Sequence, residues 1–349
     1  MADIDPKDVQ ARRPPIAIVG MGMRMRLPGG VRSAKDFWDM LVEKRTGHGE
    51  IPESRYNAKS FYDPKNPRQI RTRHGYYLQE DPAYFDADFF SISSADASMT
   101  DPQLRLLLEV IWECLENAGE TDWRGKSIGC YVGTFGEDWL SLSTREYQHV
   151  NRYYVLGTGA FALSNRISYV YDFKGPSMTI QTGCSASLIG LHEACQALHL
   201  GECSSAVVAG TNLILSPSMT KTMSANMVIS ESGMCRSLDE SADGYGRGEA
   251  INAIYIKRLD DAIRNNDPIR GIIQGTASNS DGWKSVITAP DLLSQESLIR
   301  AAYRNANISD ISKTAYFECH GTGTATKPNV GHSEGASGVT SVIKAVLSL

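Results

Sequence analysis

Short apolar runs alternate with amphipathic segments along most of the chain. The apolar runs are rich in β-branched and small residues, which is the pattern of buried strands, and fall at 16–19, 128–132, 178–180, 206–209, 253–256, 272–274 and 315–318. Helical periodicity marks 33–44, 161–171, 185–200, 293–305 and 333–349. Strands alternating with helices predict an α/β fold with parallel layering.

Capping signals mark two helix starts. Ser33 is placed to cap the first helix, and Asp101 caps a further helix that has Pro102 in its first turn. Between them, residues 47–94 are rich in Pro, Tyr, Asp and Arg and show little periodicity, which is typical of functional or interface segments. The last predicted helix reaches the final residue without a cap, so we expect the chain to stop within a domain.

Composition narrows the class of protein. Of 349 residues, 42% are hydrophobic and 21% are charged, as in a soluble globular protein. The net charge of −5 indicates neither nucleic acid nor an anionic membrane as a partner. Residues 1–14 are expected to be a disordered lead-in, and they lack the apolar core of a signal peptide. No apolar run in the sequence has the length of a membrane span. Seven scattered cysteines without a CxxC pair indicate free thiols in a reducing, cytoplasmic setting.

One cysteine is distinguished by its position. Cys184 follows Gly183 where an apolar strand meets a helix that opens with small residues. The glycine permits a tight turn and a close approach of substrate. A thiol at a helix N-terminus lies at the positive end of the helix dipole, which is expected to lower its pKa and favour the nucleophilic thiolate. The alternative is a buried structural cysteine.

Two histidines near the end of the chain offer proton-donating groups. His320 follows the predicted strand 315–318, and His332, twelve residues later, precedes the last predicted helix. Both are expected to point into a cleft, with Lys327 as a nearby charged partner. A zinc site is disfavoured for want of a third clustered ligand, and a cysteine protease needs one base rather than two. Capping or surface histidines remain the alternative.

Together these segments resemble the β-ketoacyl synthase (ketosynthase) family, and most closely the ketosynthase domains of fungal-type reducing polyketide synthases. The resemblance runs from Ile16 onward and includes matches at 16–22, 27–30, 101–109, 131–139, 242–249 and 278–282. The segment 132–138, Val-Gly-Thr-Phe-Gly-Glu-Asp, favours the polyketide type over related thiolases and initiation-type condensing enzymes.

The resemblance implies a thiolase-like fold of five layers, αβαβα, built from two related halves. The first half would span residues 15–260 and carry the nucleophile, and an incomplete second half would span 261–349 and carry the histidines. It also implies a homodimer. The acyl and malonyl thioester substrates would arrive on the phosphopantetheine arm of an acyl carrier protein, and neither a metal nor another directly bound cofactor would be needed.

Carried over to this sequence, the family's roles make Cys184 the acyl-accepting nucleophile. His320 and His332 would donate hydrogen bonds to the malonyl thioester carbonyl and promote decarboxylation, and Lys327 would support His332. The resulting enolate would attack the acyl-cysteine, a decarboxylative Claisen condensation in which fixed donors at the enolate oxygen lower the barrier. The implied enzyme is an acyltransferase of the 3-oxoacyl-carrier-protein synthase type.

Two departures from the family pattern bear on activity. Thr326 joins Lys327 directly, where the family has several dozen further residues, although twelve extended residues can still bridge two strand ends. Family members also continue beyond the position of Leu349 into a glycine-rich loop that supplies an oxyanion-hole donor, whose loss would slow the reaction about 100- to 1000-fold. The alternative function is therefore a catalytically inactive remnant that only binds a partner or dimerises.

Overall fold

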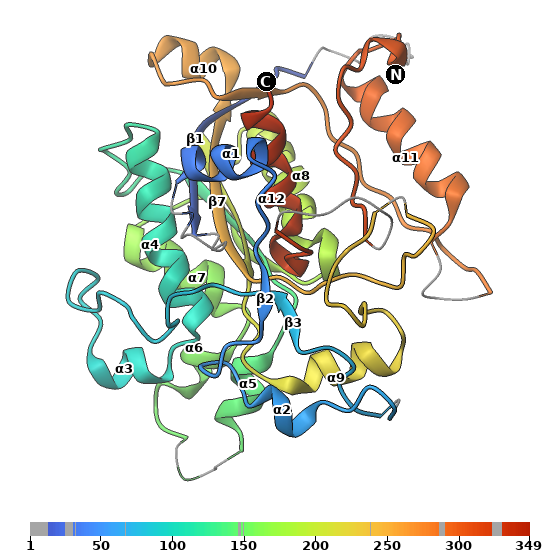
Figure 1. The fold of residues 1–349 in the computed structure, drawn as a ribbon. Coiled ribbons are helices and arrows are strands. Elements are labelled where there is room, and N and C mark those ends of the chain that lie inside the picture. The colour runs from blue at the N-terminus through green and yellow to red at the C-terminus, as the bar shows by residue number, and fades with distance from the viewer. Residues whose placement is uncertain are drawn as a thin grey trace.

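A computed structural model describes residues 13–24, 31, 33–66, 68–145, 148, 150–237, 239–285, 290–322 and 330–349 (Figure 1). The expected lead-in, residues 1–14, lies outside this part except for its last two residues. The Arg13 guanidinium donates to the Gln196 side chain at 2.6 Å, and the Pro14 carbonyl lies 2.9 Å from a ring nitrogen of His199. Both partners belong to helix α8 (Ala186–Leu200), so the chain enters the fold along this helix.

A mixed sheet forms the centre of the protein. Its six strands lie in the order β5-β4-β6-β7-β1-β8. Their bounds are β1 Ile16–Arg24, β4 Ile128–Gly133, β5 Ser177–Ile180, β6 Ser205–Asn212, β7 Ala250–Arg258 and β8 Gly271–Ile273. β4 runs parallel to β5 and β6, whereas β7 is antiparallel to β6 and β1, and β8 is antiparallel to β1.

The expectation of parallel layering is therefore wrong for three of the five strand pairings in this sheet. β7 is buried along its whole length except its last residue. A strand covered on both faces has a continuous apolar sequence whichever way it runs, so composition alone does not reveal its direction. The positions of the six strands that form the sheet are confirmed.

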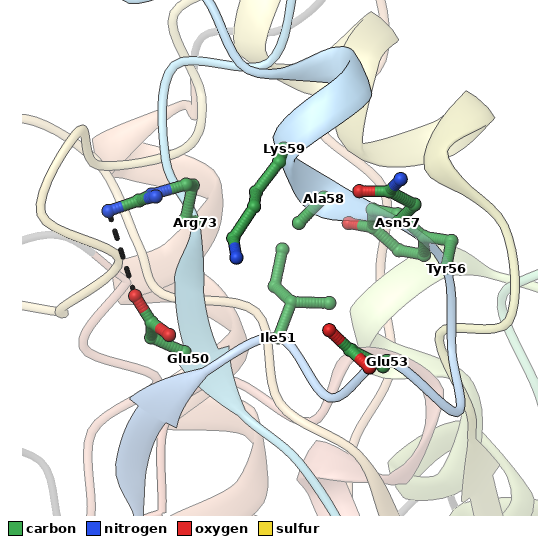
Figure 2. A pocket seen from close by; sticks show the side chains of 8 residues that line it. All are labelled: Glu50, Ile51, Glu53, Tyr56, Asn57, Ala58, Lys59 and Arg73. Atoms are coloured by element: carbon green, nitrogen blue, oxygen red, sulfur yellow. Dashed lines mark ion pairs between the residues drawn. The ribbon is translucent and has the colours of Figure 1, made fainter.

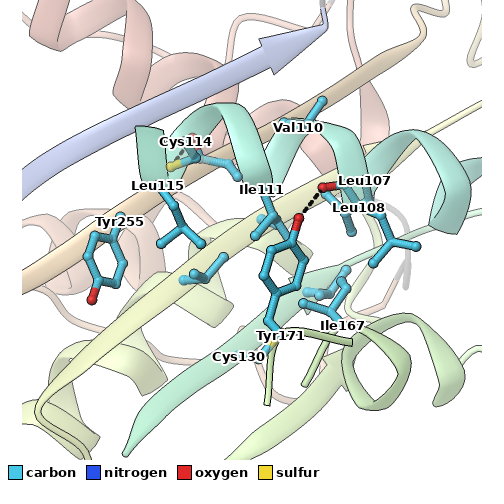
Figure 3. Close-up of a cluster of buried hydrophobic side chains, with 14 of the residues drawn as sticks. Leu107, Leu108, Val110, Ile111, Cys114, Leu115, Cys130, Ile167, Tyr171 and Tyr255 are labelled. Atoms are coloured by element: carbon cyan, nitrogen blue, oxygen red, sulfur yellow. Dashed lines mark hydrogen bonds between the residues drawn. The ribbon is translucent and has the colours of Figure 1, made fainter. Parts of the chain in front are cut away.

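Alternate strand residues point to opposite faces of the sheet. Within β6, Val207 faces the cluster built by α4 (Pro102–Asn117) and α7 (Ala162–Tyr171), which Figure 3 shows from close by. Its neighbour Val208 faces the cluster that contains α8 and α12 (Ser337–Leu347). The described residues thus build three layers, with the sheet between two sets of helices.

The helices begin close to the predicted positions. Ser33 caps α1 (Ala34–Val42) by accepting from the Asp36 N–H, and Asp101 caps α4 by accepting from the Gln103 N–H. The other described helices are α2 Ala58–Phe61, α3 Ser94–Met99, α5 Asp138–Ser143, α6 Tyr154–Thr158, α9 Pro217–Ala225, α10 Leu259–Arg264 and α11 Leu292–Asn305, with 3-10 turns η2 Gly183–Ser185, η3 Ile311–Lys313 and η4 Glu334–Ala336. Within the described ranges, no helix has both the length and the apolar character needed to cross a membrane.

The strand predicted at 315–318 is not formed. These residues have no regular secondary structure and are mostly exposed. A strand needs a neighbour that pairs its backbone groups, and neither sheet of the described residues includes this segment. The second sheet of a five-layer arrangement is accordingly not present among the described residues.

The irregular region 47–94 is tied to the centre of the protein. It holds a two-stranded antiparallel ribbon, β2 (His48–Glu50) with β3 (His74–Tyr76). The Arg55 guanidinium donates to both carboxylate oxygens of Glu249 at 2.7 and 2.8 Å, and both side chains are fully buried. This buried pair positions the region beside the start of β7, next to the segment that holds the candidate site.

Candidate active site

Cys184 lies at a sharp turn between β5 and α8. Gly183 has φ +71°, a left-handed conformation that glycine adopts without strain, and it begins the 3-10 turn η2 that leads into the helix. The Ser337 hydroxyl donates to the Cys184 carbonyl at 2.8 Å, which joins this turn to the start of α12. The predicted glycine turn before the cysteine is confirmed.

The thiol and the two histidines meet in space. The ligand atoms of Cys184, His320 and His332 all lie within 4.8 Å of one another. The two imidazole rings are 4.9 Å apart between centroids and nearly perpendicular, at 83°. The short separation of the histidines in sequence therefore does not prevent both rings from reaching the cysteine. A zinc site was disfavoured from the sequence because no third ligand lies near the two histidines. In the structure Cys184 supplies this third ligand, so that reason no longer holds.

His332 is held by the backbone that precedes β7. Its N–H donates to the Gly246 carbonyl at 2.9 Å, and its carbonyl accepts from the Gly248 N–H at 2.8 Å. The Tyr245 ring packs edge-on against the His332 ring, with centroids 4.6 Å apart. His332 is thus buried and fixed, whereas His320 lies on an irregular segment and is exposed.

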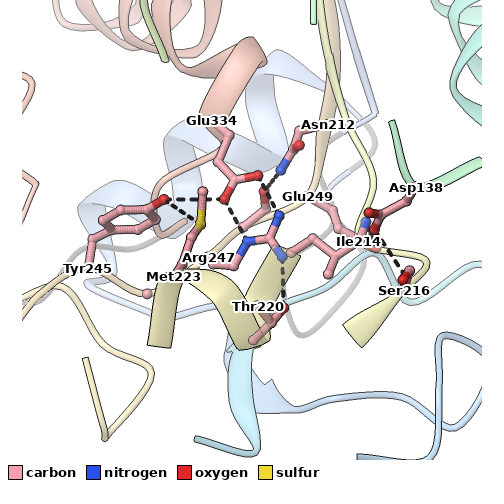
Figure 4. A network of polar contacts seen from close by, with 12 residues as sticks. Asp138, Asn212, Ile214, Ser216, Thr220, Met223, Tyr245, Arg247, Glu249 and Glu334 are labelled. Carbon is pink, nitrogen blue, oxygen red and sulfur yellow. Dashed lines mark hydrogen bonds and ion pairs between the residues drawn. The ribbon is translucent and has the colours of Figure 1, made fainter. Parts of the chain in front are cut away.

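A buried ion pair links Arg247 to Glu334, which lies two residues after His332 (Figure 4). The Arg247 guanidinium donates to both oxygens of Glu334 at 2.6 and 2.8 Å and to the Thr220 hydroxyl at 2.7 Å. Glu334 has φ +45°, an uncommon conformation for a residue other than glycine. Because Glu334 follows His332 by two residues and Arg247 lies within the segment that binds His332, the pair fixes the histidine turn against β7.

Burial raises the pKa of the Cys184 thiol, and the negative charge of Glu334 adds to this effect. Backbone N–H groups of Cys184 and Ser185 act in the opposite direction, as the helix start predicts, but they do not outweigh the loss of water. The expectation of a lowered pKa is therefore wrong. At neutral pH this thiol is protonated and needs a base when it reacts.

Both histidines are neutral at physiological pH. Burial, the neighbouring His320 and the Arg247 charge together lower the pKa of His332 to about 3, and burial has the largest effect. Loss of water around its ring also lowers the pKa of His320, even though part of that side chain is exposed. A neutral imidazole carries one N–H donor and one acceptor nitrogen, so each histidine can either donate to an oxygen or take a proton.

A cavity of about 390 Å³ opens at this cluster. Its walls come from the start of α8, the segment 318–320 and α12, and both Cys184 and His320 line it. A smaller hollow of about 80 Å³ beside β2 and α2 is drawn in Figure 2. Its lining includes Glu50, Lys59 and Arg73 but neither cysteine nor histidine, so the larger cavity is the one suited to nucleophilic chemistry.

Part of this site was not predicted from the sequence. Lys327 lies outside the described residues, so its support of His332 stays a prediction. No role was predicted for the three residues that hold His332 in place, Tyr245, Arg247 and Glu334. A buried arginine that donates to both oxygens of a carboxylate has no sequence pattern of its own. Two signals were available: Tyr245 and Arg247 lie in the family match 242–249, and Arg247 is flanked by Gly246 and Gly248, which let other chain segments approach closely.

Two family models match most of this chain. The model of the β-ketoacyl synthase N-terminal domain matches residues 13–262, and that of the β-ketoacyl synthase C-terminal domain matches residues 270–326 and 324–349 as two pieces. The chain belongs to the β-ketoacyl synthase family. The break in the second match falls at the Thr326–Lys327 junction, where the sequence departs from the family pattern.

Its curated relatives include fungal polyketide synthases. The highly reducing polyketide synthases g433 of Fusarium sp and gloL of Glarea lozoyensis are 52% and 50% identical to it over 96% and 99% of this chain. Each match covers 14% of the relative, so the chain spans about one seventh of their length. The gloL alignment is 373 residues long against 349 here, so at least 24 of its positions have no counterpart in this chain.

Solved structures of similar shape are ketosynthases. The oxazolomycin ketosynthase domain OzmH KS7 of Streptomyces albus has a TM-score of 0.89 at 30% identity and is matched over 96% of this chain and 63% of its own. The module 6 ketosynthase of the Bacillus subtilis bacillaene synthase has a TM-score of 0.83 at 33% identity, over 95% and 61%. These neighbours confirm the thiolase-like α/β fold class.

Proposed function

We propose that this chain is the condensing part of a reducing polyketide synthase and joins an acyl group on Cys184 to a malonyl unit. The observation that carries the proposal is the meeting of one thiol and two imidazoles within 4.8 Å at an open cavity. A thiol can accept an acyl group covalently, and imidazole N–H groups can stabilise a developing oxyanion.

In the first half-reaction the Cys184 sulfur attacks the carbonyl carbon of an acyl thioester. A new carbon–sulfur bond forms, the carrier thiol leaves, and the thiol proton passes to it. Because Cys184 is protonated at neutral pH, a base must remove this proton during attack. The neutral histidines are close enough to Cys184 to take the proton and return it to the leaving thiol.

In the second half-reaction a malonyl thioester loses carbon dioxide and leaves an enolate. Neutral His320 and His332 donate N–H groups to its oxygen, which stabilises the charge as it develops. The enolate carbon then attacks the acyl-cysteine carbonyl, a carbon–carbon bond forms, and the Cys184 sulfur leaves as a thiolate that takes up a proton. Lys327, next in sequence to the junction, would support His332 during this step.

We further propose that both substrates arrive on the phosphopantetheine arm of an acyl carrier protein, with no other cofactor bound directly, and that the active form is a homodimer. The openness of the Cys184 cavity and the exposed edge strand β5 support these two points. Residues 15–260 and 261–349 would act as the two halves of the condensing unit, in the reducing cytoplasm.

Acylation of Cys184 tests this function. The purified chain is incubated with a short acyl thioester of N-acetylcysteamine, and its intact mass is measured. We expect one acyl adduct on the wild type and none on Cys184→Ala. Cys319→Ser is the matched control, because Cys319 also lines the cavity and should leave the adduct unchanged. A folded protein without an adduct would contradict the condensing function and favour a remnant that only binds a partner.

A further inference from the structure

The cavity contains the donor set of a zinc site. Thiolate sulfur and imidazole nitrogen are the ligands that Zn²⁺ prefers, and three of them converge here from two distant parts of the chain, 184 and 320–332. We propose that Cys184, His320 and His332 bind one Zn²⁺ ion, and that this ion blocks the thiol reversibly. This inhibitory metal site shares its three residues with the proposed condensation, but the metal takes no part in that reaction.

The distances require only a small contraction. Zinc–sulfur bonds of about 2.3 Å and zinc–nitrogen bonds of about 2.0–2.1 Å place tetrahedral ligand atoms about 3.4–3.6 Å apart. The three atoms now lie within 4.8 Å of one another, so a movement of about 1 Å brings them to zinc geometry. His320 can make this movement because its segment is irregular and its side chain partly exposed, whereas the His332 backbone is fixed to Gly246 and Gly248.

Neighbouring charges favour a soft cation over a hard one. Mg²⁺ and Ca²⁺ need oxygen ligands. Two carboxylates at the site are already paired: Glu334, whose charge acts on Cys184, with Arg247 at 2.6 Å, and Glu318, which lines the cavity, with Lys344 at 2.9 Å. The site therefore offers sulfur and nitrogen rather than free carboxylate oxygen, and the set selects Zn²⁺ among the common divalent ions.

Three protein ligands leave the fourth zinc position for water from the cavity. Binding requires the thiolate, so the Cys184 proton is released to solvent as the zinc–sulfur bond forms. The same sulfur cannot hold an acyl group and a zinc ion together. Zinc binding and acylation of Cys184 therefore exclude each other. The concentration of free Zn²⁺ then determines what fraction of the chain has a Cys184 sulfur that is available for acylation.

Metal binding to the full chain tests the site without any need for turnover. Zn²⁺ affinity is measured by competition with a chromogenic chelator at neutral pH, and Co²⁺ is used as a spectroscopic probe of sulfur coordination. We expect one Zn²⁺ per chain and a thiolate-to-cobalt charge-transfer band. Cys184→Ser should abolish the band, and His320→Ala should weaken Zn²⁺ binding at least about 10-fold.

Cys319→Ser is the matched control, because Cys319 is an exposed thiol at the same cavity but outside the cluster; it should keep both the band and the affinity. Zn²⁺ should also protect Cys184 from iodoacetamide, as read by peptide mass, while Mg²⁺ should not. A band that survives in Cys184→Ser, or full affinity in a His320→Ala protein with unchanged circular dichroism, would overturn the proposal. Loss of binding in Cys319→Ser would also overturn it.

Discussion

At the scale of single residues, the surroundings of Cys184 decide its protonation. The sequence placed this thiol correctly at a helix start, and the backbone N–H groups there do favour the thiolate. Burial and the Glu334 charge act more strongly in the other direction. Neither could be seen from the sequence, because both depend on packing between segments about 150 residues apart.

Replacing Glu334 by glutamine should make Cys184 more acidic. The substitution removes a negative charge that disfavours the thiolate and leaves Arg247 unneutralised, so the pKa of Cys184 falls and the fraction of thiolate rises at every pH. The rate of iodoacetamide alkylation, followed by mass between about pH 6 and 10 around the ordinary thiol pKa, should shift to lower pH. An unchanged profile, or a shift to higher pH, would contradict this description of the site.

The Arg247–Glu334 pair should also contribute strongly to folding. Arg247→Met leaves the Glu334 carboxylate buried without its partner, which typically costs about 3–5 kcal/mol of unfolding free energy. The double variant Arg247→Met/Glu334→Leu should recover much of this loss, because no unpaired charge remains. Urea unfolding measures both. Lys35→Met, which breaks the exposed Lys35–Asp39 pair, is the control and should change little.

At the scale of helices and strands, local pattern predicted most of what is observed. The capped starts of α1 and α4 and the six strands of the sheet follow from periodicity and capping residues. Two features did not follow. The direction of β7 is set by its neighbours, and the segment 315–318 has strand composition but no pairing partner among the described residues.

The turn between β5 and α8 should depend on glycine at position 183. With φ +71°, Gly183→Ala puts a side chain in the left-handed region at a cost of about 1–2 kcal/mol, and its Cβ meets only ordinary contacts at 3.6 Å or more. The strain should displace Cys184, so adduct formation should slow by about 5- to 30-fold, the rate equivalent of that strain. Gly136→Ala is the control, because Gly136 has open space around it. Equal acylation rates in the two variants would contradict the argument.

At the scale of the whole molecule, the site combines residues that no local pattern connects. Cys184 and His320 are 136 positions apart, and only the family resemblance linked them before the fold was known. The three-layer arrangement explains why Cys184 meets His332: α8 and α12 pack on the same face of the sheet, α8 begins two residues after Cys184, and α12 begins five residues after His332.

The sheet edge at β5 should form the proposed homodimer contact. β5 pairs only with β4 among the described strands, and its Met178 is 39% exposed. Met178→Lys places a charge at this edge and should convert dimer to monomer in analytical ultracentrifugation. Met227→Lys, at an exposed position after α9, is the control and should leave the dimer intact. A dimer that survives Met178→Lys would place the contact elsewhere.

The most direct test of the proposed condensation is the formation of its carbon–carbon bond. The chain is first acylated on Cys184 and then given a malonyl thioester of N-acetylcysteamine, and the products are identified by mass spectrometry. We expect a β-ketoacyl thioester that carries the acyl group from the enzyme, with release of carbon dioxide, and no such product from Cys184→Ala. A folded, acylated chain that keeps its acyl group and yields no β-ketoacyl product would contradict it.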